Sequence, residues 1–243
     1  MRKERDLKRG LQIYIKDVRR VIFNKTAAAV IISSITVALM LKLMFPFFLE
    51  EGAGTELIIS SVFKLMIIYY AVSHFGSDYF TKTARLIYSV QEERLVIFAF
   101  KLLANMTTAL YFAAIHMLLR LSGLTGEITS AGELLTIPAV YLIFSTAVTV
   151  FSIVFSLAVK SGVAILIADY FLFFWTVGDN LAVLGQKISV GFLQPVFIHN
   201  TFYELGRSFA AMHIDQITMK SAIPFILFFG IAGALMLRRK DIS

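Results

Sequence analysis

The chain has 243 residues, of which 58% are hydrophobic, and its mean hydropathy is +0.78. A water-soluble domain of this size could not carry that composition without exposing large apolar patches, so a soluble globular enzyme is excluded. The absence of cysteine excludes disulfides, thiol catalysis, iron–sulfur clusters and cysteine zinc sites, and the net charge of +7 makes the positions of the basic residues informative.

Residues 1–25 are predicted to form an amphipathic helix on the cytoplasmic surface of the membrane. Basic residues extend to Lys25, so we do not expect a cleaved signal peptide. The helix could be a simple anchor or a contact surface for a cytoplasmic partner, whereas a nucleic-acid partner is not expected beside anionic lipid headgroups. Its apolar residues recur every three or four positions: Leu7, Leu11, Tyr14, Ile15, Val18, Val21 and Ile22.

Six apolar stretches follow, and each is predicted to be a transmembrane helix. Because lipid offers the backbone no hydrogen bonds, a span must be a helix or part of a closed barrel, and no stretch shows the alternation of a barrel strand. Most contain the roughly 20 apolar residues that cross a ~30 Å core, although the fifth is short. They are residues 26–49, 57–77, 95–119, 134–159, 162–177 and 221–237. We therefore predict an all-α polytopic membrane protein with one domain, residues 1–243.

The basic residues between these spans predict the topology. Seventeen of the 23 Lys and Arg fall before the first span, in alternate connections or after the last span, which places both termini in the cytoplasm of a multi-pass protein of the cell membrane. These residues are Arg2, Lys3, Arg5, Lys8, Arg9, Lys16, Arg19, Arg20, Lys25, Lys82, Arg85, Arg94, Lys101, Lys160, Arg238, Arg239 and Lys240.

The connection between the second and third spans is longer, more apolar and more charged than an ordinary loop. Residues 78–96 are predicted to form a cytoplasmic helix, because Leu86, Ile87 and Val90 are spaced among polar residues in a way that suits docking into a groove of another protein. A solvated cap on the helix ends is the alternative. The charged residues of this coupling segment are Asp78, Lys82, Arg85, Glu92, Glu93 and Arg94.

Lys42, Lys64 and Asp169 are charged residues within the predicted spans, where a charge costs about 3 kcal/mol or more. Lys42 and Lys64 are near outer ends, and we expect them to anchor at the interface or to pair with Glu50, Glu51 or Glu56. Asp169 lies about seven residues into the fifth span. Its carboxylate is expected either to bond Ser, Thr or Tyr of a neighbouring helix or to line a substrate path or dimer seam.

The outer segment of residues 178–220 is too polar to span the membrane twice and too long to be structureless. Its apolar part, residues 188–202, is interrupted by Gly191, Gln194, Pro195, His199 and Asn200. This mixture predicts re-entrant helices buried in protein, with a soluble extracellular cap as the alternative.

The order of these elements resembles the permease subunit of a type-2 ATP-binding-cassette exporter. The likeness rests on the basic first helix, six spans, the charged segment 82–101, the outer stretch 193–206 (LQPVFIHNTFYELG) and the terminal Arg-Arg-Lys-Asp-Ile. It implies an exporter in which two permeases pair, a homodimer being favoured, and each seats a cytoplasmic ATP-binding-cassette ATPase. The residues that would contact the ATPase are Arg85, Glu92, Glu93 and Arg94.

The chain itself lacks the motifs of an enzyme. It has no GxxxxGK[ST] loop, so ATP and magnesium are expected on the partner and no cofactor on this chain. It also lacks HExxH and GxSxG, and its four histidines fall in four regions, so no catalytic residue and no metal site is predicted. The high Phe content favours an amphipathic peptide, a lipid or a hydrophobic drug as substrate. A membrane scaffold or immunity protein that transports nothing is the alternative function.

Overall fold

The computed structural model describes residues 2–44, 53–80, 94–125, 131–159, 161–174, 180, 183, 184, 187 and 200–239. Within these ranges the chain forms helices and no strand, so the all-α prediction is confirmed there. The helices are α1 (Arg2–Ile22), α2 (Lys25–Met44), α3 (Ala53–Phe80), α5 (Arg94–Leu121), α6 (Ala131–Val159), α7 (Gly162–Asp169), the π-helix η3 (Tyr170–Phe174), α10 (Thr201–Ala211) and α11 (Gln216–Arg239).

In the described part of the chain, five helical segments are long and apolar enough to cross a membrane. They are Leu7–Val37, Thr55–His74, Arg94–Leu121, Ala131–Val159 and Gln216–Arg238. The predicted fifth span is present only as the shorter apolar helix Val163–Phe174. A multi-pass membrane protein is therefore indicated, while the sixth span stays a prediction.

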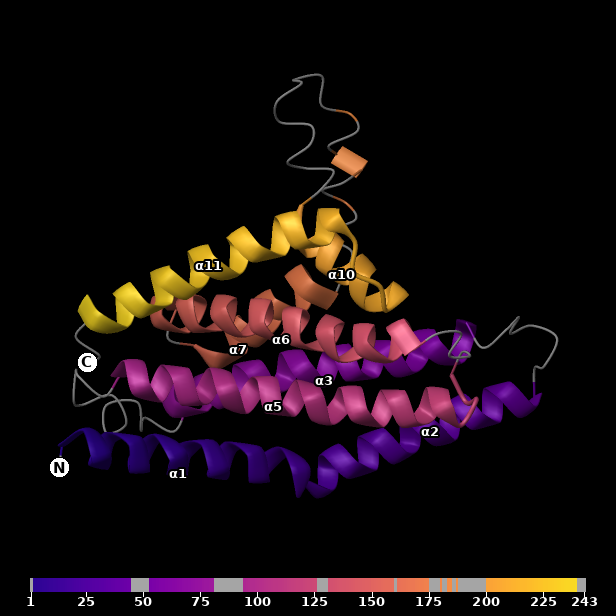
Figure 1. The fold of residues 1–243 in the computed structure, drawn as a ribbon, viewed down its shortest axis with the longest axis horizontal. Helices are drawn as coiled ribbons and strands as arrows, with labels where there is room; N and C mark the ends of the chain where they lie inside the picture. The colour runs from indigo at the N-terminus through magenta and orange to yellow at the C-terminus, as the bar shows by residue number, and fades with distance from the viewer. Residues whose placement is uncertain are drawn as a thin grey trace.

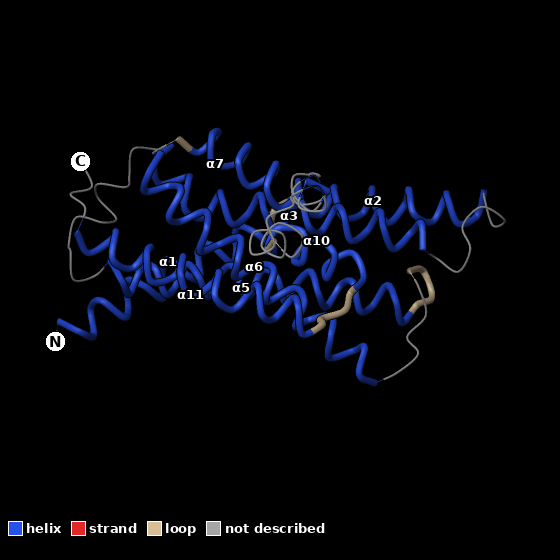
Figure 2. Tube along the Cα trace, turned by 90° about the horizontal axis from the view of Figure 1, so that it is seen from above, coloured by secondary structure: helices blue, strands red, loops and turns tan. Residues whose placement is uncertain are grey.

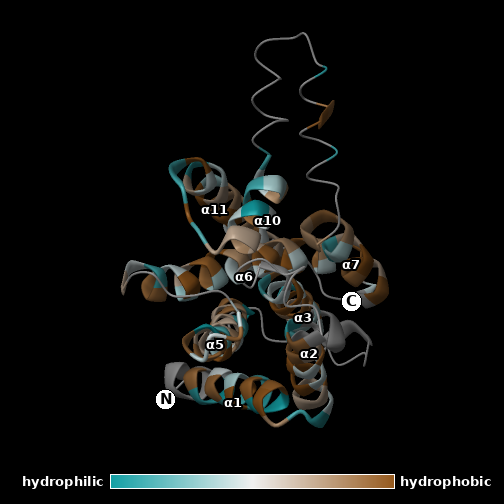
Figure 3. Cartoon of the chain, turned by 90° about the vertical axis from the view of Figure 1, so that its right-hand side faces the viewer, coloured by the Kyte–Doolittle hydropathy of each residue, from teal (hydrophilic) through white to brown (hydrophobic). Residues whose placement is uncertain are grey.

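The long helices form a bundle (Figures 1 and 2). α2 continues in the direction of α1, and α3, α5, α6 and α7 then alternate in direction. α1 begins, α5 begins and α11 ends at one end, which we call the α1 end. The opposite end, where α3 and α6 begin and α10 lies, is the α10 end. Seen along the bundle, α6 occupies the centre, with α5 and α1 on one side and α10 and α11 on the other (Figure 3).

The core is built around α6. Its buried residues Tyr141, Phe144 and Phe151 contact aromatic rings of η3, α10 and α11, and Phe144 lies with its ring centroid 4.8 Å from that of Phe209. The inner face of α10 adds Leu205 and Phe209, both almost fully buried. Lipid is as apolar as the core, so the hydrophobic effect does not drive these helices together. Van der Waals packing of the rings stabilises their association instead.

The first helix differs from its predicted position. α1 is a helix as predicted, but it runs alongside α5, parallel to the bundle, instead of lying across the ends of the spans (Figure 1). Tyr14 bonds Thr107 at 3.1 Å and packs near the ring of Phe100, which occupies the space a side chain on Gly10 would need. The amphipathic pattern that fits a membrane surface fits this helix–helix contact equally well. α1 ends before Asn24, whose side chain accepts from the backbone N–H of Thr26.

Candidate functional site

Polar residues follow one another along the buried side of α5. Each is almost fully buried except Arg120, whose side chain is 13% exposed. Their spacing of three, four, seven or eight positions keeps them on one side of a helix. They are Arg94, Lys101, Asn105, Thr108, His116 and Arg120. The facing residues of α6 are Ser145, Thr149, Ser152 and Ser156, all buried. We call these two rows the polar seam.

At the α10 end, the polar seam contacts a buried carboxylate of α3. Arg120 donates to both oxygens of Glu56, with Nη2 2.7 Å from Oε1 and Nε 3.4 Å from Oε2. His116 Nε2 lies 3.0 Å from Glu56 Oε1, and its Nδ1 lies 2.8 Å from the hydroxyl of Tyr141 on α6. Because a buried carboxylate is costly unless its charge is paired, this network fixes α3, α5 and α6 to one another.

In the middle of the seam, hydroxyl and amide groups join α5 to α6. Asn105 Nδ2 donates to the hydroxyl of Thr149, and the hydroxyl of Ser145 donates to the carbonyl of Asn105 at 3.2 Å. Thr149 in turn donates to the carbonyl of Ser145 at 2.6 Å. Hydrogen bonds between membrane helices are worth about 0.6 to 2 kcal/mol each, so these contacts favour one register of α5 on α6.

Asp169 joins the seam from α7. It is the last residue of α7, it is fully buried, and its Oδ2 accepts from the hydroxyl of Ser152 on α6. The same hydroxyl lies 2.8 Å from the carbonyl of Val148, so its one proton is shared between two acceptors. Asp169 therefore lies between α6 and α7, in a position compatible with either role anticipated from the sequence, and its function in a pathway stays a prediction.

At the α1 end, two basic residues of α5 hold the ends of other helices. Arg94 donates from Nη1 to the carbonyl of Leu237, near the end of α11, at 3.1 Å. Lys101 donates to the carbonyl of His74 on α3. Arg94 is 8% exposed and contacts α11, and its predicted contact with an ATPase stays a prediction. Arg85, Glu92 and Glu93 lie outside the described residues.

Lys42 and Lys64 have neighbours among the described residues that the sequence did not indicate. Lys42 donates to the carbonyl of Gly123, and Lys64 lies over the rings of Phe144 and Phe174. Glu56 pairs with Arg120 and His116, while Glu50 and Glu51 are outside the described residues. Within the described ranges no group of three or more His, Asp or Glu side chains could hold a metal ion.

The polar seam is not evident from the sequence when each apolar stretch is taken as uniform. The signal was present in the spacing of Lys101, Asn105 and Thr108, which repeats at His116 and Arg120, within an otherwise apolar segment. Within residues 145–156, the hydroxyl side chains also recur every three or four positions, at Ser145, Thr149, Ser152 and Ser156. Of the residues along the seam, the charged Arg94 and Asp169 were singled out, because a full charge stands out in an apolar segment where a small hydroxyl does not.

Comparisons with known proteins identify no relative of this chain. No known protein family matches it, and no curated protein matches it. Its function has to be argued from its helices and the groups they bury.

Proposed function

We propose that this chain is the permease subunit of an ATP-driven exporter in the cell membrane. Six spans with both termini in the cytoplasm form the pathway for an amphipathic or hydrophobic substrate. Two copies pair, and each binds a separate cytoplasmic ATP-binding-cassette ATPase that hydrolyses ATP with magnesium. The helical architecture supports this proposal through its five membrane-length helices. The 17 of 23 Lys and Arg that fall before the first predicted span, in alternate connections or after the last span support it through the positive-inside rule.

The observation that carries the proposal is the connection of three helices at the start of α5. The charged segment 81–93 leads directly into Arg94, which bonds the carbonyl of Leu237 on α11. About two helical turns further along α5, Lys101 bonds α3. A partner that moved this segment would therefore move α3, α5 and α11 together. A permease that is driven by a separate ATPase needs such a connection, because movement at the contact must be transmitted to its helices. This chain has no phosphate-binding loop of its own.

The apolar outer face of α11 supports the pairing of two permeases. Leu227, Phe228, Ile231 and Leu235 recur at helical spacing and are between 47% and 67% exposed. No charged residue interrupts α11 between Lys220 and Arg238. This face suits contact with lipid or with the same face of a second copy.

The decisive experiment is purification of the tagged chain from its native membrane, followed by measurement of bound ATP-binding-cassette ATPase and of vanadate-sensitive ATP hydrolysis. A double variant, Glu92→Lys with Glu93→Lys, should release the ATPase and leave the permease folded, because charged groups at a partner contact can contribute about 2–5 kcal/mol. The matched control, Lys187→Glu with Lys220→Glu, reverses two exposed charges in the outer segment and should retain the ATPase.

Arg94 has to be tested separately, because it holds α11. Arg94→Met should lower stability even in the absence of ATPase, as judged by unfolding of the purified permease. If no ATPase accompanies the unaltered chain, the proposal fails, and a membrane scaffold or immunity protein becomes the better description.

A further inference from the structure

The carboxyl group of Asp169 is buried where the bundle offers it few hydrogen bonds. It lies at the end of α7 and is fully buried. Among the described residues its Oδ1 has no hydrogen-bond partner, and its Oδ2 contacts the hydroxyl of Ser152 on α6. A buried anion is costly unless a cation or several hydrogen-bond donors surround it. These surroundings therefore suit a neutral carboxyl group better than a carboxylate.

The hydrogen bonds of Ser152 indicate the same state. Its hydroxyl has one proton and lies 2.8 Å from the carbonyl of Val148, besides its contact with Asp169. If Asp169 is ionised, this one proton has to serve two acceptors. If Oδ2 of Asp169 carries a proton, the carboxyl donates to the serine oxygen, and the serine proton is left for the carbonyl of Val148. The same oxygen positions then give each proton its own acceptor.

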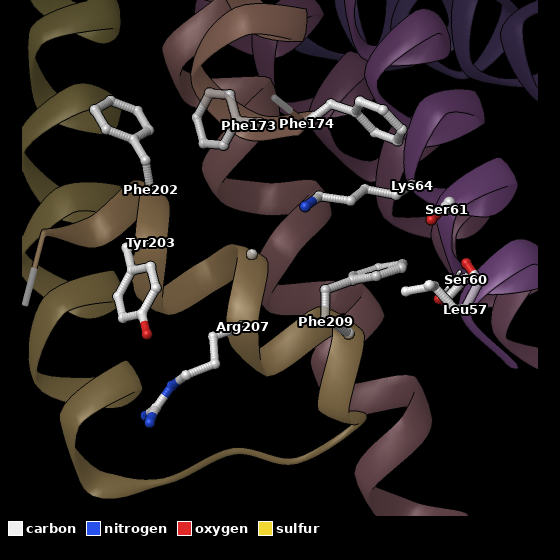
Figure 4. Close-up of a pocket in the computed structure, with 12 residues that line it drawn as sticks. Leu57, Ser60, Ser61, Lys64, Phe173, Phe174, Phe202, Tyr203, Arg207 and Phe209 are labelled. Carbon is white, nitrogen blue, oxygen red and sulfur yellow. Dashed lines mark hydrogen bonds between the residues drawn. The ribbon is translucent and has the colours of Figure 1, made fainter. Parts of the chain in front are cut away.

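The ionisable side chains on the elements packed against α7 have been compared with this position. α7 contacts α3, α6 and η3. Within the described residues, no hydrogen bond or ion pair joins an ionisable side chain of these elements to Asp169. The lysine of α3, Lys64, points into a pocket of about 430 Å³ between α3, η3 and α10, and Asp169 does not line that pocket (Figure 4). The side chains compared are Glu56, Lys64, Tyr69, Tyr70 and His74 of α3, Glu133 and Tyr141 of α6, and Tyr170 of η3.

A proton fits this position better than a metal ion does. A proton needs one oxygen atom, whereas a hard metal cation takes about six or more oxygen ligands. Among the described residues, the hydroxyl of Ser152 is the oxygen in hydrogen-bond contact with the Asp169 carboxyl. A sodium ion would need further ligands, so it is treated as the competing occupant in the test.

We propose that Asp169 is a proton-binding site of the bundle. The carboxyl takes up one proton from water when α7 packs on α6, and it returns that proton to water when the contact opens and Asp169 is hydrated. Separation of α7 from α6 is thereby linked to the release of one proton. The proposal concerns this residue alone and does not depend on the proposed export function.

The first test is infrared spectroscopy of the purified chain in dodecyl maltoside at pH 7, without ATPase or ATP. A protonated carboxyl group has a carbonyl-stretching band that a carboxylate lacks. Wild type that carries aspartate isotope-labelled at the side-chain carboxyl carbon should show an acid band shifted by the label, and Asp169→Asn should lose that band. The matched control, Asp215→Asn, removes a carboxylate that pairs with Arg207 and should keep it.

The second test is the pH dependence of unfolding in mixed micelles. An aspartate exposed by unfolding is ionised at neutral pH, so wild type loses a proton on unfolding that Asp169→Asn does not. Stability from this site is therefore lost as the pH rises. Between about pH 6 and pH 8, the unfolding constant of wild type should rise about tenfold per pH unit relative to that of Asp169→Asn. The ratio of wild type to Asp215→Asn should stay constant over the same range.

The labelled wild type decides the proposal without reference to the folding of any variant. If it shows no acid band from aspartate at pH 7, the proposal is overturned, because Asp169 is then ionised and balanced by a cation. The same pH dependence in wild type and Asp169→Asn would also overturn it. Stabilisation of wild type, but not of Asp169→Asn, by sodium chloride and not by choline chloride would reject the proton and assign the site to a sodium ion.

Discussion

The helices α6 and α11 are similar in apolar composition and opposite in environment. Phe144 on α6 is 1% exposed, whereas Phe228 on α11 is 67% exposed. α6 contacts α3, α5, α7, α10 and α11, while α11 covers one side of the bundle and its other side is exposed (Figure 3). Hydropathy places both in a membrane, but it does not say which one is central.

The distinction lies in the small polar residues. α6 carries Ser145, Thr149, Ser152 and Ser156 on one side, and all are buried against other helices. α11 has no hydroxyl residue between Ala222 and Leu237. Since a polar group costs less inside protein than in lipid, hydroxyl residues at helical spacing mark the interior helix of a membrane bundle.

The largest difference between the two helices is expected on removal of a ring. Phe144→Ala should lower the free energy of unfolding by about 3 kcal/mol, because the ring packs on Phe173 and Phe209. Phe228→Ala, its matched control, should change it by less than about 0.5 kcal/mol. Unfolding in mixed micelles of sodium dodecyl sulfate and dodecyl maltoside, followed by circular dichroism, measures both. Equal losses would show that α11 is covered by a partner in the micelle or that α6 is not central.

A smaller effect is expected at the contact of α7 with α6. Asp169→Leu should cost about 2 kcal/mol, because Ser152 loses its acceptor on α7, while Asp169→Asn should keep most of the stability. Adding Ser152→Ala to Asp169→Leu should cost less than the sum of the single changes, since both remove one interaction. The same unfolding measurement applies. If Asp169→Leu keeps wild-type stability and transport, Asp169 has neither a structural role nor a role in the pathway. If Asp169→Asn is stable but loses transport, the charge of Asp169 serves the pathway.

The smallest effect is expected at the start of α11. Asp215 Oδ1 accepts from the backbone N–H of Thr218 at 2.7 Å, and this hydrogen bond, with a smaller contribution from Arg207, holds the pKa of Asp215 below its usual range. Asp215→Ala should therefore cost about 1 kcal/mol at neutral pH, as helix-capping residues do. Because the pKa is lowered on folding, this stability is present above the ordinary pKa of about 4 and is lost as the pH falls through the lower folded value.

Unfolding of wild type and Asp215→Ala at pH 7 and at pH 3 measures that dependence. The difference between the two proteins should shrink at the lower pH, and Asp215→Asn should stay close to wild type at neutral pH. A difference that is the same at both pH values would mean that the carboxylate charge contributes nothing to the start of α11.

Several of the long helices could be predicted from the sequence because lipid allows the backbone few alternatives. The spans predicted at 57–77, 95–119, 134–159 and 221–237 all fall within or close to described helices of membrane length. The position of α1 could not be predicted in the same way. The contact of Gly10 with Phe100 depends on residues 90 positions apart, and an amphipathic helix has the same pattern beside a helix as on a membrane surface.

The candidate site was predicted only where a single residue departs from its surroundings. Asp169 stands out as a carboxylate in an apolar run, but its partner Ser152 does not, because a hydroxyl can bond its own helix and appears anywhere in a span. Glu56 and Arg120 are both visible as charges near span ends. Their pairing became evident only when the fold brought α3 and α5 together, 64 residues apart in sequence.

The change from α-helix to π-helix after Asp169 constrains the length of this segment in evolution. η3 accommodates its residues in wider turns, so that Phe173 faces α6 and α10 while Phe174 reaches Lys64. Deletion of one residue between Tyr170 and Phe174 would change the angle and the height along the helix at which the remaining rings project, because a π-helix and an α-helix differ in residues per turn. Both rings would then leave their contacts. Descendants of this chain can therefore exchange side chains here more readily than they can gain or lose a codon.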